Sequence, residues 1–371
     1  MSPARFLTAF TLVVATSLSA VAGVNYYVDP ANLFGDRTYE AGVAALLAQG
    51  KGVANVTDYD ERLVQKFFAE RLTARRDVLV LGSSRAMNLV PEYFGSTSFF
   101  NASVSGASLE DLSAILQIYR ERGLLPRRLV LGVDPWMFNR NSGQTRWKSL
   151  EAEYARAVSR GRGDDSAVFD GVGASRAAQL ISYAYFRASL QAPDRRDRNF
   201  FATDAAELDV NIRRADGTIT YRRELAHRGI DEARAWVLKQ ASQTPVYSLG
   251  QFRELDAEDR RQFASLLERL RREGVEVSLF LAPYHPAMYE VLSRADGPYA
   301  MVAQAERYVR DVARARNLPL FGSYDPAATG CSAAEFYDEM HPKPSCLDRI
   351  VKSRRGPDAG MTDSAAETSR R

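Results

Sequence analysis

The alternation of short apolar runs with helical stretches limits this chain to few folds. The apolar runs lie at 78–81, 98–104, 128–133, 275–282 and 318–322, and helical periodicity occurs at 109–122, 256–273 and 299–317. Strands that alternate with helices form βαβ units, and such units build a mostly parallel sheet covered by helices. The sequence therefore predicts the α/β class, with any site at the carboxyl ends of the strands.

Residues 140–250 interrupt this alternation. They are rich in Arg, Asp and Ser and show weak periodicity. Within them, Asp216-Gly217 stands between two strand-like flanks, which is a signal for a β-hairpin. We expect an insertion that carries helices and one hairpin.

The N-terminal 25 residues indicate a membrane-related segment. Residues 6–24 contain no charged side chain, and a helix of this length spans roughly 28 Å, close to the thickness of a bilayer core. The segment is either an uncleaved anchor or a signal peptide with a small-residue cleavage site at Ala20-Val21-Ala22. Both alternatives place the rest of the chain outside the cytoplasm, on the periplasmic side of a bacterial inner membrane or secreted.

The two cysteines, Cys331 and Cys346, are the only ones in the chain. In an oxidising compartment they could form a disulfide, but their spacing alone leaves open whether they are bonded or free.

Composition excludes several classes of function. The net charge of the 371 residues is only +3, and acids and bases are interleaved, whereas a nucleic-acid-binding protein concentrates Lys and Arg on one element. The chain has no zinc-ligand spacing, phosphate-binding loop or dinucleotide fingerprint. We therefore expect no nucleic-acid partner, no metal and no cofactor.

Polar residues follow the apolar runs where a parallel sheet would bring them together. Ser84 comes directly after the first run, and Asp338 precedes His341 by three residues near the C-terminus. A serine hydroxyl is a poor nucleophile unless a base takes its proton and a third group orients that base. We expect His341 to be the base and Asp338 to orient it, with Ser83 as the alternative nucleophile if the turn is offset by one residue.

These motifs resemble those of the SGNH hydrolases, also called GDSL-like esterases and acyltransferases. The turn Gly82-Ser83-Ser84 matches the family's Gly-Asp-Ser turn, Asp338 and His341 match its Asp-x-x-His, and Asn101-Ala102-Ser103 matches its Asn-x-Gly-type loop. The resemblance covers roughly 75–135 and 255–350. It implies a flavodoxin-like three-layer α/β/α sandwich, with Ser84 as nucleophile and the backbone N–H groups of Ser84 and Ser103 as donors to the oxyanion.

One block departs from the family pattern. The family usually has Gly-x-Asn, whose amide donates to the oxyanion, but this chain has Gly132-Val133-Asp134. An ionised Asp134 would repel the developing negative charge. Either Asp134 is protonated, or it has another role and a different donor replaces it, with Arg85 and Asn101 as candidates.

The resemblance implies a division of the chain and a function. Residues 1–25 would be an anchor or signal peptide, 26–74 a linker and leading helix, 75–352 an SGNH-like catalytic domain with the insertion at about 140–250, and 353–371 a disordered tail. The Ser-Arg turn and "GVDPWMFN" look like those of membrane-anchored relatives in bacterial surface-polymer pathways, including alginate O-acetylation and teichoic-acid D-alanylation proteins.

The expected function is therefore acyl-ester hydrolysis or O-acyl transfer on acetyl or similar groups of a surface or secreted polysaccharide, with a possible protein partner. The alternative is a non-catalytic, membrane-tethered subunit that keeps the fold to bind a polymer or an assembly partner, since fold does not determine function.

Overall fold

The computed structural model describes residues 2–29, 38–159, 178, 180–191, 199–294 and 297–354. Its central sheet has five parallel strands in the order β3-β2-β4-β8-β9. These strands are β2 (Val78–Leu81), β3 (Phe99–Asn101), β4 (Arg128–Gly132), β8 (Glu276–Leu281) and β9 (Leu320–Gly322). Numbered along the chain, the spatial order is 2-1-3-4-5, the doubly wound order of flavodoxin-like folds. The predicted α/β class and parallel sheet are confirmed.

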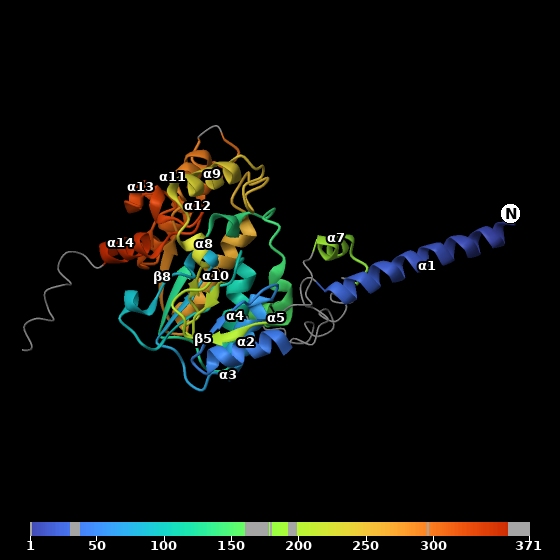
Figure 1. Ribbon diagram of the computed structural model, residues 1–371, viewed down its shortest axis with the longest axis horizontal. Helices are drawn as coiled ribbons and strands as arrows, with labels where there is room; N and C mark the ends of the chain where they lie inside the picture. Colours follow the sequence, from blue (N-terminus) through green and yellow to red (C-terminus); the bar gives the residue numbers. More distant parts are fainter. Residues whose placement is uncertain are drawn as a thin grey trace, which may run out of the picture.

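The strands are buried on both faces, as their continuous apolar runs require. Leu79 and Leu81 of β2 join the larger apolar core, whereas Val78 and Val80 join a smaller core on the opposite face. The larger core is closed by α3 (Glu61–Arg71), α4 (Leu109–Glu121), α10 (Ala257–Arg272) and α12 (Met301–Ala315), and the smaller core by α14 (Pro344–Arg354). The molecule therefore has three layers, helices–sheet–helix (Figure 1).

Local signals determine where the helices begin. The Ser108 side chain accepts from the backbone of Asp111, whose carboxylate accepts in return from the Ser108 N–H, so a capping box starts α4. Asp256 caps α10, a helix that the periodicity of the sequence predicted. Further helices among the described residues are α2 (Thr38–Ala48), α5 (Glu151–Ser159), α7 (Tyr183–Gln191), α8 (Arg223–Ala226), α9 (Ile230–Ala241), α11 (Pro286–Leu292) and α13 (Pro326–Thr329).

A second sheet lies beside the first and is antiparallel, in the order β5-β1-β6-β7. Its strands are β1 (Gly52–Ala54), β5 (Phe201–Thr203), β6 (Ile212–Arg213) and β7 (Ile219–Thr220). The hairpin predicted around Asp216-Gly217 is the β6–β7 pair. Gly217 has φ +81° and approaches the Asn101 carbonyl so closely that a Cβ would lie 2.2 Å from its oxygen.

The β6–β7 hairpin is attached to the carboxyl edge of the parallel sheet. The Asn101 N–H donates to the Asp216 carbonyl at 2.7 Å, and the Ile219 N–H donates to the Met87 carbonyl at 3.3 Å. Because Asn101 ends β3 and Met87 closes the turn after β2, the insertion is held over the end of the sheet where Ser84 lies.

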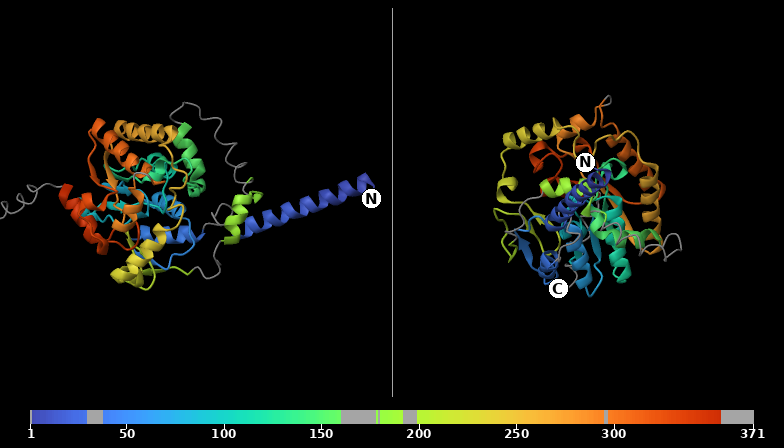
Figure 2. Two further views of the ribbon diagram at one scale, coloured as in Figure 1. Left: turned by 90° about the horizontal axis from the view of Figure 1, so that it is seen from above. Right: turned by 90° about the vertical axis from the view of Figure 1, so that its right-hand side faces the viewer.

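Helix α1 (Pro3–Val28) extends away from the rest of the protein (Figures 1 and 2). Among the described residues it is the helix that is long and apolar enough to cross a membrane, and its most apolar window is entirely exposed. Such a helix fits either an anchor or a signal sequence. The expected linker falls partly, and the expected tail mostly, outside the described residues, at 30–37 and 355–371.

Cys331 and Cys346 form a disulfide, with their Cα atoms 5.3 Å apart. The pair ties the segment after α13 to the first turn of α14. This settles the alternative that the spacing of the cysteines left open.

Candidate active site

The turn after β2 presents Ser84 at the carboxyl edge of the sheet. Gly82 is needed there because the backbone at the end of β4 lies close by, and a Cβ on Gly82 would lie 2.9 Å from the Gly132 Cα. The buried Ser83 side chain accepts from the Arg85 N–H at 3.2 Å and so caps the short 3₁₀ turn Ser84–Ala86. Ser83 therefore has a capping role, and Ser84 is the residue whose hydroxyl faces outward.

Ser84, His341 and Asp338 form a continuous hydrogen-bonded chain. The Ser84 Oγ lies 2.9 Å from His341 Nε2, and His341 Nδ1 lies 2.7 Å from Asp338 Oδ2. Asp338 Oδ1 also accepts from the backbone N–H groups of Met340 and His341, at 3.0 and 2.9 Å. With its proton on Nδ1, neutral His341 donates to Asp338 and leaves Nε2 to accept from the Ser84 hydroxyl.

The Asp338 carboxylate makes His341 a stronger base. Burial lowers the pKa of the imidazole, but the adjacent Asp338 outweighs burial and the net pKa lies above the usual value for histidine. Burial raises the pKa of Asp338, but His341 and the two backbone N–H groups outweigh it and hold the net pKa below the usual value. Asp338 is therefore ionised, and His341 takes a proton readily.

Arg85 and Asp134 form a buried ion pair next to the hydrogen-bonded residues Ser84, His341 and Asp338. Arg85 Nη1 donates to Asp134 Oδ1 at 2.7 Å, and both side chains are almost fully buried. The guanidinium lies 3.8 Å from the centre of the Tyr284 ring, and its other nitrogens donate to the carbonyls of Ala282 and Met340. Asp134 thus has another role, as a partner of Arg85, and the guanidinium is committed to these partners rather than to an oxyanion.

This ion pair leads to a prediction about stability. Asp134→Ala leaves Arg85 buried without its counter-ion, so we expect the free energy of unfolding to fall by about 3–5 kcal/mol. The matched control is Asp311→Ala, which removes the exposed Asp311–Arg314 pair and should change stability by less than about 1 kcal/mol. Chemical denaturation measures both variants, and equal small losses would contradict the assignment.

The other two expected oxyanion donors are also occupied. The Asn101 amide donates to the carbonyls of Ala86 and Leu89 at 2.9 and 3.2 Å, and its Oδ1 accepts from the Ser103 N–H at 3.1 Å. Asn101 therefore holds the loop after β3 against the Ser84 turn. Ser103 is fully buried, and its N–H is used within the protein rather than offered to a substrate. The backbone N–H of Ser84, by contrast, has no acceptor among the described residues.

Ser84 and His341 open into a pocket of about 250 Å³. The pocket is lined by residues of five segments: Val56, Tyr59, Glu61, Ser84, Met87, Ser105, Asn211, Arg213, Ile219, Tyr221 and His341. Arg213 Nη2 donates to Glu61 Oε1 at 2.9 Å and to the Tyr59 hydroxyl at 3.2 Å, so the charges opposite Ser84 cancel.

Tyr221 is a further residue at this pocket that sequence reasoning missed. Its ring centre lies 5.9 Å from that of His341, and its hydroxyl makes no hydrogen bond to the described residues. Burial raises the pKa of the hydroxyl well above its usual value, so it stays protonated. The only sequence signal for this wall was the hairpin at Asp216-Gly217, and nothing in the sequence indicated that the hairpin folds over Ser84.

The other two histidines of the chain and the aromatic side chains after β4 lie outside this pocket. His285 Nδ1 accepts from the Ala287 N–H and caps α11, and the exposed His227 pairs with Glu207. Trp136 and Phe138 are buried in the main core. Among the residues the structure describes, no group of three or more His, Cys, Asp or Glu could hold a metal ion.

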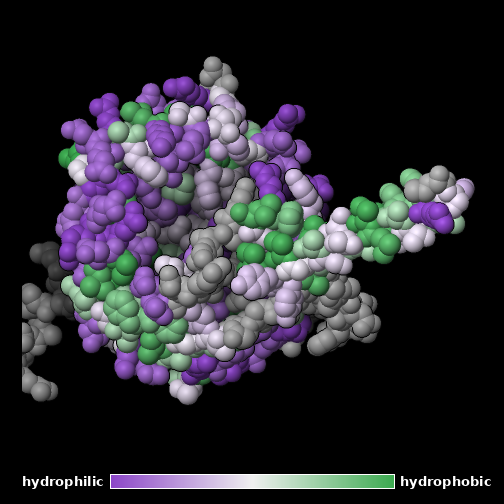
Figure 3. All heavy atoms as spheres, turned by 45° about the vertical axis from the view of Figure 1, so that its right-hand side comes forward, coloured by the Kyte–Doolittle hydropathy of each residue, from purple (hydrophilic) through white to green (hydrophobic). Residues whose placement is uncertain are grey.

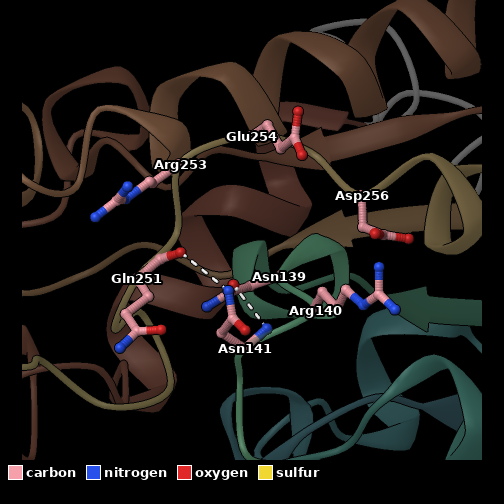
Figure 4. Close-up of a pocket in the computed structure, with 7 residues that line it drawn as sticks. All are labelled: Asn139, Arg140, Asn141, Gln251, Arg253, Glu254 and Asp256. Atoms are coloured by element: carbon pink, nitrogen blue, oxygen red, sulfur yellow. Dashed lines mark hydrogen bonds between the residues drawn. The ribbon is translucent and has the colours of Figure 1, made fainter.

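A second hollow, of about 390 Å³, shares no lining residue with the Ser84 pocket (Figure 4). It lies between the segment after β4 and the loop that leads into α10. Asn141 spans it by donating to the Gln251 carbonyl at 3.2 Å. The described lining contains no serine, cysteine or histidine, so this hollow offers no counterpart to the hydrogen-bonded chain at Ser84.

Comparison with known proteins adds little to what the geometry of the site shows. No protein-family model matches the chain, and no curated protein does. A solved structure described as a "putative acylhydrolase" from Bacteroides fragilis NCTC 9343 is similar, with 12% sequence identity and a TM-score of 0.34. The match covers 76% of this chain and 88% of that one. This similarity is too low to indicate a function for the chain.

Proposed function

We propose that this protein is a serine-dependent enzyme of acyl esters, either an esterase or an O-acyltransferase. The observation that carries the proposal is the hydrogen-bonded chain from the Ser84 Oγ through His341 to Asp338, with links of 2.9 and 2.7 Å. This order of hydroxyl, imidazole and carboxylate activates a serine for attack on a carbonyl.

The reaction then follows from the geometry. Ser84 Oγ attacks the carbonyl carbon while His341 Nε2 takes the hydroxyl proton, and ionised Asp338 stabilises the resulting imidazolium. His341 returns the proton to the leaving alcohol as the ester bond breaks, which leaves the acyl group on Ser84. Water or a second hydroxyl, deprotonated by His341, releases the acyl group and regenerates the serine.

Two groups at the pocket are suited to bind the oxyanion. The Ser84 N–H has no acceptor among the described residues, and the Tyr221 hydroxyl is protonated and likewise without a described acceptor. Ser84 and Tyr221 line the same pocket, into which the Ser84 hydroxyl opens. Tyr221 would then replace the donor that Asp134, held by Arg85, does not supply.

This assignment leads to a prediction for Tyr221→Phe. The substitution keeps the ring and removes only the hydroxyl, so we expect kcat to fall about 10²–10³-fold, the usual cost of losing one oxyanion donor. The matched control is Tyr337→Phe, because Tyr337 packs on Tyr221 with ring centres 4.6 Å apart but lines a different pocket. Steady-state kinetics decide the question, and similar kcat values for the two variants would rule out a role for the Tyr221 hydroxyl.

The size and the charges of the pocket favour a small, uncharged acyl group. Its volume is about 250 Å³, and because Glu61 is paired with Arg213, its described lining offers no unpaired charge to bind a charged acyl chain. An acetyl group fits both limits. Together with the exposed apolar helix α1, this supports an extracytoplasmic substrate, and we propose acetyl esters of a surface or secreted polysaccharide.

An acyl-donor assay separates the possible activities. The purified protein is incubated with p-nitrophenyl acetate, with and without an unacetylated oligosaccharide, and acetate and acetylated sugar are both quantified. Acetate alone indicates an esterase, and acetylated sugar indicates a transferase. Neither product from a folded protein would contradict the enzymatic proposal and favour a polymer-binding subunit.

A further inference from the structure

The last turns of α1 differ from the rest of that helix because their polar side chains are buried. Asn25 is 0% and Asp29 is 4% exposed. The Asn25 amide donates to the Leu180 carbonyl at 2.8 Å and accepts from the Ser189 hydroxyl at 3.0 Å, and the Tyr185 hydroxyl donates to Asp29 at 2.5 Å. These contacts hold α7, from the insertion, against the end of α1.

Apolar side chains surround this polar contact and face outward. They form what we call the junction patch, which has two tyrosines on α1 and three residues on or just before α7, exposed by 58–82%: Tyr26, Tyr27, Ile181, Tyr183 and Leu190. Apolar surface continues from α1 onto its junction with the body (Figure 3). The patch is therefore continuous with the surface of α1, whose most apolar window is also wholly exposed.

The length of α1 indicates what covers the patch. Its 26 residues form a helix of about 39 Å, longer than a hydrocarbon core of about 30 Å. If the apolar window crosses the core, the C-terminal turns and α7 lie at the headgroup level. Tyrosines concentrate at that level, and amphipathic helices lie there with their apolar face in the lipid.

We propose that α7 is an interfacial helix that binds the surface of a lipid bilayer through the junction patch, beside the point where α1 leaves the membrane. The hydrogen bonds of Asn25, Asp29, Tyr185 and Ser189 set the position of α7 relative to α1. The protein is then attached at two adjacent sites, a spanning helix and a surface helix, which restricts how the body can tilt. The proposal does not depend on the activity of Ser84.

The test uses the full chain in phosphatidylcholine nanodiscs, with its intact mass measured. Because the native cysteines are bonded to each other, Leu190→Cys gives a single free thiol for an environment-sensitive fluorophore. The control is Leu238→Cys, at an exposed leucine of α9. We expect lipid-borne nitroxide near the headgroups to quench the Leu190→Cys label several-fold more strongly than the control label, with the reverse order for aqueous acrylamide.

Three results would overturn the proposal. One is equal lipid quenching of the two labels. Another is protection of the Leu190→Cys label from both quenchers, which would mean that a protein surface covers the patch. The third is a mature chain that lacks α1. A further variant tests the polar contact: adding Tyr185→Phe to Leu190→Cys should lower lipid quenching, and an unchanged value would show that the Tyr185–Asp29 bond does not position α7.

Discussion

Replacing Ser84 with alanine is expected to lower kcat for ester cleavage by on the order of 10⁴- to 10⁶-fold, because the reaction loses its nucleophile and the remaining groups act as a unit. The Ser84 hydroxyl makes one hydrogen bond within the described chain, to His341. Its loss should therefore leave the fold and the thermal transition nearly unchanged. The rate of p-nitrophenol release, measured with circular dichroism of the same samples, provides the test.

The neighbouring serine is the matched control for this variant. Ser83 is buried and caps the 3₁₀ turn through the Arg85 N–H, so Ser83→Ala should cost stability, by about 1 kcal/mol, and keep kcat within about tenfold of the wild type. If Ser83→Ala lost the activity and Ser84→Ala kept it, the nucleophile would have been assigned to the wrong residue.

Replacing Asp338 with asparagine is expected to lower kcat by about 10³–10⁴-fold, because the amide no longer holds the His341 tautomer that accepts from Ser84. It should also shift the pH profile. Catalysis needs neutral His341, and the Asp338 carboxylate outweighs burial to raise the pKa of that imidazole. Activity of the wild type therefore falls as pH drops through a pKa above the usual 6.5, and removing the carboxylate should move this acid limb to lower pH.

The pH dependence of kcat/KM measures that shift, with the residual activity of the variant followed in single turnovers if necessary. An acid limb at the same pH in both proteins would mean that His341 is not the group whose protonation is observed. A limb that moved upward would contradict the charge assignment for Asp338.

The parallel half of the fold could be predicted because its signals are local. Strand β2 begins and ends where the apolar run does, at Val78 and Leu81, and the capping residues Ser108 and Asp256 begin α4 and α10. Each of these features is determined by residues within a few positions of one another. These local signals were sufficient to predict the α/β class and the parallel sheet, whereas the flavodoxin-like arrangement was expected only from the family resemblance.

The antiparallel sheet was not predictable for the opposite reason. Its strands have two or three residues each, too few to show a period, and β1 pairs with strands about 150 residues away. The hairpin at Asp216-Gly217 could be recognised from its turn residues, but its attachment to Asn101 depends on a close approach that only the folded chain contains.

Some residues of the candidate site could likewise be predicted from local signals, and others could not. Asp338 and His341 are three residues apart, so their pairing could be expected, and Ser84 follows a recognisable strand. The Ser84 N–H could be expected as an oxyanion donor, but the availability of the other candidates depends on hydrogen bonds that the sequence pattern does not reveal. Arg85 is taken up by Asp134, 49 positions away, and Ser103 by the side chain of Asn101. Tyr221 could not be identified from the sequence, because it lies in the insertion, outside the segments that resemble the family.

The most direct test of the central assignment is covalent trapping of the nucleophile. The full-length protein is treated with a fluorophosphonate probe at several pH values, digested, and analysed by mass spectrometry to locate the adduct. The account predicts one adduct, on Ser84, that forms faster as pH rises through the pKa of His341 and disappears in His341→Ala. A folded protein that carries no adduct, or an adduct on another residue, would contradict it.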